Sequence, residues 1–329
     1  SDMYDIGNIV HTRTLADPDW GIKLTGKSGR NTIGFFTARD TLTPLNFPEA
    51  EGCDNTTLSL QSQGTLFHYR RDILESSTVG ILLTDREGRK YYNRFGFIYS
   101  DVKFTKTDQL TFQAGGSSTL YPADTADEFE QKTGNFEGGA YGFNYNHNTE
   151  NYNVYMQYQV LNPDLRADLG FITQVGYRNN EIGGEYRWRS DGDNWYNWIS
   201  IYASHDYKTD YNYRPLHNVF SASFNYQGPL QSYFGISGGH GYNYYEGKKY
   251  RANFINPWGG IRPNSSTSLN IWANIGDQID YTNNRLGSKF AIGPSIEQKI
   301  GDRLKLGLEH RYENLKVCLL YTSPSPTRP

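Results

Sequence analysis

One segment of the chain carries the letters of a serine nucleophile motif. Gly235–Gly239 reads G-I-S-G-G, which fits G-x-S-x-G, and His240 follows it directly. The motif works only where a strained turn between a strand and a helix exposes the serine oxygen. Here the surrounding pattern is that of a strand with no helix after it, and strand residues an odd number apart point to opposite faces. Ser237 and His240 should therefore lie on opposite faces, so we assign no catalytic residue and expect glycine-rich strand packing instead.

The candidate metal ligands are dispersed along the chain. The seven histidines form no H-E-x-x-H motif or other close ligand cluster. Cys53 and Cys318 are far apart and lie in no metal-ligand spacing. Asp191–Asn194 offers oxygen atoms but lacks the spacing and closing glutamate of a calcium loop, so a tight turn is expected there. We predict no metal and no cofactor, and we lean toward a protein that is not an enzyme.

Two groups of side chains are candidate binding residues. Aromatic rings suit the CH-rich faces of sugars, and in a membrane protein the same rings form belts at the headgroup level. The candidates for either role are Trp195, Trp198, Tyr242 and Tyr244. Charged residues on the polar faces of strands would line an interior, where they tune solute passage or form an ionic network that closes a small bore. The candidates for lining are Arg94, Lys305, Glu309 and Arg311.

The overall composition excludes several classes of protein. The 329 residues include 32 basic and 35 acidic ones, for a net charge of -3 at pH 7. A nucleic-acid partner needs a clustered positive field, which this balance does not provide. Aromatic residues make up 15% of the chain, too many for a disordered protein. Helical membrane spans are excluded too, because a span needs about 20 consecutive apolar residues and the best runs, such as Val79–Leu83, are about a quarter of that.

The dominant pattern is an alternation of apolar and polar residues with a period of two. In Val219–Tyr226, Phe, Ala, Phe and Tyr alternate with Val, Ser, Ser and Asn. In Leu304–Glu309, three leucines alternate with Lys305, Gly307 and Glu309. Roughly sixteen such runs follow one another, including one near Leu169–Tyr177, and no window shows a capped amphipathic helix. This is the pattern of β-strands with one apolar and one polar face.

The strands are expected to close into a barrel in a membrane. Tight turns separate most runs, and residues 39–64 and 116–137 form longer connections. Closure removes the edges of a large sheet, and recurring polar faces suit a wet interior. We therefore predict an all-β fold, an antiparallel up-and-down transmembrane β-barrel of roughly sixteen strands over residues 1–316, as a fragment whose closure can be incomplete. A soluble sandwich, propeller or β-helix is the alternative, although no fixed repeat is evident.

The two ends of the chain depart from this pattern. Pro324, Pro326 and Pro329 forbid a central strand in residues 317–329. Cys318–Pro326 resembles translated sequencing-adapter read-through, so we expect a non-native tail, with a short disordered tail as the alternative. The chain begins at Ser1 with neither a signal peptide nor an initiator methionine, so we expect an internal fragment of a longer protein.

Three separated segments resemble one bacterial family. They are residues 21–34, 69–86 and 162–172, and they occur in the family's order. The family is an uncharacterised barrel domain, the domain of unknown function five-nine-one-six, which usually follows a carbohydrate-binding module of the family-nine type. Thr173–Gly176 departs from the Arg-Thr-Asp run of that family. The resemblance implies a barrel in the outer membrane of a Gram-negative bacterium, with a link to glycans.

Taken together, these patterns predict a non-enzymatic outer-membrane barrel whose partner is lipid. It would anchor a glycan-binding module, pass saccharide-related solutes in a porin-like manner, or do both. One alternative is a glycan hydrolase borne by the barrel or the module, which would need a Ser–His pair or paired carboxylates on one face. The other alternative is a soluble β-rich carbohydrate-binding module.

Overall fold

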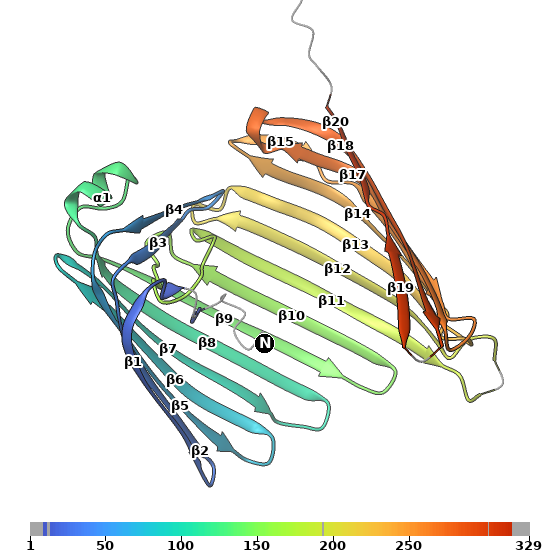
Figure 1. Cartoon of the computed structure of the whole chain (residues 1–329), viewed down its shortest axis with the longest axis horizontal. Coiled ribbons are helices and arrows are strands. Elements are labelled where there is room, and N and C mark those ends of the chain that lie inside the picture. The colour runs from blue at the N-terminus through green and yellow to red at the C-terminus, as the bar shows by residue number, and fades with distance from the viewer. Residues whose placement is uncertain (1–8, 12–13, 193, 302, 318–329) are drawn as a thin grey trace, which may run out of the picture. The chain divides into compact units, whose positions relative to one another are not determined.

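The chain is built almost entirely from β-strands (Figure 1). The computed structural model describes residues 9–11, 14–192, 194–301 and 303–317. Within these residues an 18-stranded antiparallel sheet is accompanied by a separate two-stranded sheet. The prediction of an all-β, antiparallel, up-and-down fold is confirmed, and the large sheet has 18 strands where the sequence indicated roughly sixteen. Insertion into a membrane stays a prediction.

The chain divides into two compact units. Unit 1 holds Asp206–Leu216 and the described residues up to Ile182, and unit 2 holds Gly183–His205 and the described residues from His217 onward. The single domain over residues 1–316 stays a prediction. Of the expected tail, residues 317–329, only Val317 is described, as the last residue of a strand; the remainder, with Cys318, lies outside the described residues.

Strands of unit 1 pair with their neighbours in chain order. They are β1 (Pro18–Ser28), β2 (Asn31–Asp40), β5 (Ser62–Ile73), β6 (Ser77–Gly88), β7 (Tyr91–Lys103), β8 (Asp108–Leu120), β9 (Phe136–Asn148) and β10 (Tyr152–Leu161). The side chains of β7 alternate between a buried face and an exposed face, as strand geometry requires, whereas β1 is exposed along its whole length. On β7 the buried residues are Tyr91, Asn93, Phe95, Phe97 and Tyr99.

Three insertions cover the buried face of unit 1. The first is a hairpin of β3 (Thr43–Pro48) and β4 (Cys53–Leu58), and the second holds the short helix α1 (Ala123–Glu128). The third, residues 162–176, is named here the covering segment. Its buried apolar residues are Leu165, Ala167, Leu169, Ile172 and Val175. All of these except Leu169 join the core that contains Leu82, Phe95, Phe97, Tyr99 and Ala140. The core of unit 1 therefore lies between the sheet and its insertions.

Two expectations fail in these insertions. The run near Leu169–Tyr177 is not a strand, because β11 (Tyr177–Arg189) begins only at its last residue. The backbone of the covering segment instead combines local turns, such as the 2.8 Å bond from Gly170 N to Ala167 O, with bonds to other elements, such as the 3.1 Å bond from Val175 N to Glu49 O. Its apolar residues pack onto the core. The helix α1 was not expected, since six residues are too few to show an apolar stripe.

Unit 2 repeats the alternation without such a cover. It contains parts of β11, β12 (Trp198–Asp210) and β13 (Pro215–Gln227), followed by β14 (Tyr233–Tyr245), β15 (Lys248–Arg251), β16 (Phe254–Ile261), β17 (Thr267–Asp280), the 3₁₀ turn η2 (Tyr281–Asn283), β18 (Arg285–Ile300), β19 (Leu304–Glu309) and β20 (Tyr312–Val317). Both β19 and β20 pair with β18, along different parts of its length. No helix in the described part of the chain is long and apolar enough to cross a membrane.

Candidate functional site

One side of the sheet in unit 2 is an exposed apolar face. Antiparallel register sets Ile255 on β16 opposite Ile275 on β17, and Ile275 opposite Phe290 on β18. Their side chains are 43%, 40% and 41% exposed. The same face carries Phe220, Phe234, Leu269, Ile271, Ile296, Leu304, Leu306 and Leu308, all exposed. Large contiguous apolar patches are rare on proteins in water and mark a surface that meets an apolar partner.

Unit 1 has an equivalent apolar face on the side opposite its buried core. Phe67 on β5 is opposite Leu83 on β6, and Ile81 is opposite Ile98 on β7. Exposed members of this face are Ile22, Leu24, Ile33, Phe67, Leu83, Ile98, Leu110, Phe112, Tyr141, Val154 and Met156. The sheet of unit 1 is therefore apolar on both sides, but only the side under the covering segment is closed from solvent.

A buried ion pair joins strands of unit 1 to their insertions. Arg86 on β6 and Asp40 on β2 are both fully buried, and their Nη2 and Oδ2 atoms are 3.3 Å apart. Arg86 also donates to Ser62 Oγ at 3.1 Å and to the carbonyls of Pro44 and Leu42 at 3.0 and 3.3 Å. A buried charge is tolerated only when it is paired and its remaining donors are satisfied. Arg86 meets both conditions, which fixes the connection between β2 and β5.

The covering segment is held by a second buried cluster around Asp168. Tyr91 donates to Asp168 Oδ2 at 2.7 Å, and Tyr121 donates to Oδ1 at 3.1 Å. Asn93 accepts the Asp168 amide at 2.9 Å and donates to the Arg166 carbonyl at 3.1 Å. Burial raises the pKa of Asp168, against the lowering effect of the two tyrosine hydrogen bonds and Arg86. Because these groups are satisfied by one another and closed from solvent, we assign the cluster to holding the segment in place.

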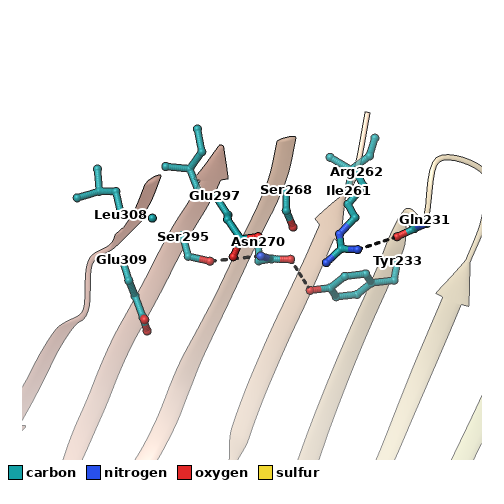
Figure 2. Close-up of a pocket in the computed structure, with 12 residues that line it drawn as sticks. Gln231, Tyr233, Ile261, Arg262, Ser268, Asn270, Ser295, Glu297, Leu308 and Glu309 are labelled. Carbon is teal, nitrogen blue, oxygen red and sulfur yellow. Dashed lines mark hydrogen bonds between the residues drawn. The ribbon is translucent and has the colours of Figure 1, made fainter. Parts of the chain in front are cut away.

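The other side of the sheet in unit 2 is a polar face with a hollow of about 800 Å³ (Figure 2). Three residues form a hydrogen-bonded row across it: Tyr233 donates to Asn270 Oδ1 at 2.9 Å, and Asn270 Nδ2 donates to Ser295 Oγ at 3.3 Å. At the rim, Arg262 donates to Gln231 Oε1 at 3.2 Å. The other polar lining residues are Ser268, Glu297 and Glu309. These side chains bring several hydrogen-bond donors and acceptors together on one face of unit 2.

Aromatic rings on this polar face lie across glycines of the next strand. A Cβ built on Gly235 would lie 2.2 Å from Cζ2 of Trp258, and one built on Gly239 would lie 2.2 Å from Cε1 of Phe254. Trp272 covers Gly293 in the same way, with a contact of 2.3 Å. Only a glycine leaves room for a ring at these positions. The glycines of the G-x-S-x-G segment therefore serve strand packing.

The serine motif forms no catalytic pair. Gly235–Gly239 lies inside the continuous strand β14, where Ser237 is opposite Ser223 on the polar face and His240 is opposite Phe220 on the apolar face. The expected placement of Ser237 and His240 on opposite faces is confirmed. No cluster of three or more His, Cys, Asp or Glu that could hold a metal occurs in the described residues. Asp193 of the turn 191–194 lies outside them.

Three of the four charged candidates lie on or beside the polar face. Glu309 lines the hollow, and Lys305 lies 2.7 Å from Glu297, which also lines it. Arg311 pairs with Glu313 at 2.8 Å, and its guanidinium lies over the Trp272 ring at 5.8 Å from the centroid. This placement agrees with the polar side that the alternation indicated; lining of a lumen stays a prediction.

Arg94 lies on the other side of its sheet. Its neighbours Asn93 and Phe95 are buried, so Arg94 points to the exposed face of β7. There it approaches Asp85 and Glu87 of β6, both at 3.6 Å. Lining of a lumen stays a prediction for Arg94. The polar residue of this strand on the side of the covering segment is Asn93, which donates to the Arg166 carbonyl.

The four aromatic candidates have ring faces already in contact with other side chains. Trp195 is 68% exposed and stacks on Tyr226 at 5.3 Å. Trp198 lies under the Arg187 guanidinium at 4.8 Å. The Lys249 ammonium lies 3.7 Å from the centroid of Tyr242 and 5.9 Å from that of Tyr244. A role in sugar stacking or in a membrane belt stays a prediction for all four.

Sequence reasoning missed Tyr233, Asn270 and Arg262, which build the hollow together with Glu309. The available signal was the alternation in residues 268–276, which places Asn270 on the polar face. It also missed the role of residues 162–172, although Arg166 and Asp168 stand out as charges among apolar residues. No model of a known protein family matches the chain. No characterised protein matches it either, so the resemblance to the barrel family stays a prediction.

Proposed function

We propose that this chain is the membrane-embedded β-domain of a bacterial outer-membrane protein, and that its role is not catalytic. The observation that carries the proposal is the exposed apolar face, which continues through the paired strands of each unit. Lipid is the partner that matches such a face, because acyl chains form no hydrogen bonds. The backbone groups of the paired strands bond to one another and need no partner in the lipid. The polar residues of the same strands then face an interior that holds water.

The domain serves as an anchor for a glycan-binding module and as a contact surface for saccharide-related solutes. The closed core of unit 1 supports the anchoring role, because the covering segment is fastened to the sheet by Asp168, Asn93 and apolar packing. Such a cover suits a supporting domain better than an open channel. The polar hollow of unit 2 supports contact with solutes.

The arrangement gives little support to catalysis. Ser237 and His240 point to opposite faces, which leaves the serine without a base. Glu297 and Glu309 do share the polar face, as paired carboxylates of a glycan hydrolase would. However, Glu297 is held as an anion by Lys305 at 2.7 Å, so it is a poor proton donor to a leaving group.

Membrane partition tests the proposal directly. The chain is refolded in lauryldimethylamine oxide, mixed with vesicles of dilauroylphosphatidylcholine and floated on a density gradient. We expect it to float with the vesicles, to resist extraction by alkali and to migrate differently on gels before and after boiling. A monodisperse, folded protein that needs no detergent and stays at the bottom of the gradient would refute the proposal in favour of a soluble module.

A further inference from the structure

The hollow on the polar face of unit 2 has a size and a lining suited to a ligand. Its volume of about 800 Å³ falls within the roughly 300–1,000 Å³ of small-molecule sites. It lies beside the turns 228–232 and 262–266, and β14, β16, β17, β18 and β19 all contribute to it. A ligand there would lie across strand backbones that are already paired.

The ring of Tyr233 provides a fixed flat surface in the hollow. A Cβ built on Gly260 would lie 2.7 Å from the ring carbons Cε1 and Cζ, so the ring lies directly on this glycine. The side chain of Tyr233 is nevertheless 40% exposed. One side of the ring is thus occupied by the sheet, which leaves the other for a ligand. An aromatic face held in this way suits a CH-rich surface.

The polar groups beside the ring are oriented and still have hydrogen-bonding capacity. Asn270 uses one lone pair for the Tyr233 hydroxyl and one N–H for Ser295 (Figure 2). A carboxamide has two lone pairs and two N–H groups, so one acceptor and one donor remain on Asn270. Arg262 uses one N–H for Gln231 out of the five on its guanidinium. Adjacent donors and acceptors of this kind match the neighbouring hydroxyls of a polyol.

The charges around the hollow favour a neutral ligand. Lys305 neutralises Glu297 at 2.7 Å, and the opposite charges of Arg262 and Glu309 balance each other. An anionic ligand would meet two carboxylates, and a cationic ligand would meet Arg262 and the nearby Lys305. With Lys305 counted beside the lining, the hollow combines one aromatic platform with several polar groups, and Arg262 and Lys305 balance Glu297 and Glu309.

We propose that this hollow binds a neutral oligosaccharide, with a sugar ring on Tyr233 and hydroxyl groups on Asn270, Arg262 and Glu309. The inference rests on the proposed function in one respect, since it requires the polar face to be in contact with water in the folded, membrane-inserted protein. It adds to that function a ligand class and the residues that hold it.

Calorimetric titration tests the site. The refolded protein is titrated in lauryldimethylamine oxide, which carries no sugar headgroup, with maltohexaose, cellohexaose and xylohexaose in turn. We expect saturable binding of at least one of them. Tyr233→Ala and Asn270→Ala should each weaken that binding about tenfold, the equivalent of ~1.4 kcal/mol. Arg262→Ala, at the rim of the hollow, provides a further variant should a change within the strands prevent folding.

The control is Tyr312→Ala, which removes an exposed aromatic ring from the opposite face of unit 2 and should leave the affinity unchanged. Heat-modifiable migration of each variant shows that it is folded. Folded, membrane-competent protein that binds none of the three sugars would overturn the saccharide site while leaving the proposed membrane role intact. Binding that is equally strong in the wild type, Tyr233→Ala and Arg262→Ala would overturn it as well. Failure of the protein to insert into vesicles would count against the membrane role instead.

Discussion

Replacing Ile275 by lysine distinguishes a sheet that faces lipid from one that faces water. Ile275 is 40% exposed on the apolar face, between Ile255 and Phe290 on the adjacent strands. It is close to the middle of the 14-residue strand β17, about 5 Å from its midpoint at ~3.4 Å per residue. In a bilayer, the lysine would therefore enter the hydrocarbon region rather than the headgroups.

The expected cost follows from this depth. A lysine on the lipid face near the midplane destabilises a barrel by about 2–4 kcal/mol, whereas a surface substitution in water usually changes stability by less than about 0.5 kcal/mol. We expect Ile275→Lys to lower the free energy of unfolding in dilauroylphosphatidylcholine vesicles by about 2–3 kcal/mol, since it lies slightly away from the midpoint. Equilibrium unfolding in urea, followed by tryptophan fluorescence, measures this change.

The matched control is Asn274→Lys, which places the same charge one residue earlier and on the polar face. We expect it to change the free energy of unfolding by less than about 0.5 kcal/mol. Equal effects of the two substitutions, or a negligible effect of Ile275→Lys in vesicles, would show that the apolar face does not contact lipid and would refute the reasoning.

Two further predictions concern the covering segment. Gly138→Ala would place a Cβ 2.2 Å from the backbone nitrogen of Leu165, so it should loosen the segment, destabilise unit 1 by about 1–3 kcal/mol and speed limited proteolysis. The control is Gly139→Ala, whose Cβ would have an ordinary 3.5 Å contact and should have none of these effects. Equal rates of proteolysis for the two variants would contradict the packing. Because burial raises the pKa of Asp168, its contribution to stability is complete below its unfolded pKa of about 3.9 and is lost as pH rises through the folded value. In urea titrations at several pH values, Asp168→Asn should therefore reduce the fall in the free energy of unfolding above about pH 4. The same dependence of that free energy on pH in the variant and the wild type would count against a raised pKa.

The sequence alone gave reliable information on which face each strand residue occupies. The alternation of leucines with Lys305 and Glu309 predicted their separation onto two faces, and β18–β19 pairing confirms it. The same reasoning separated Ser237 from His240 correctly. These predictions depend on the geometry of consecutive residues, so no information on distant contacts was needed.

The covering segment shows where this reasoning stops. Its apolar residues resembled a strand, but its backbone forms local turns and scattered bonds to other elements, and its side chains meet a core formed elsewhere in unit 1. Arg86 and Asp40 are 46 residues apart, and no local pattern in the sequence links them, yet they form a fully buried pair.

The sequence by itself determined that this protein is a chain of antiparallel strands with one apolar and one polar face, because a period of two is a property of the extended backbone. Only the tertiary structure decided which strands lie side by side in register, and hence that Tyr233 and Asn270, 37 residues apart, meet in one hollow. It also decided that one side of unit 1 is closed over an apolar core by an insertion, while unit 2 has an open hollow on its polar face. Such contacts arise from strand register and the folding of insertions, which depend on residues far apart in the chain.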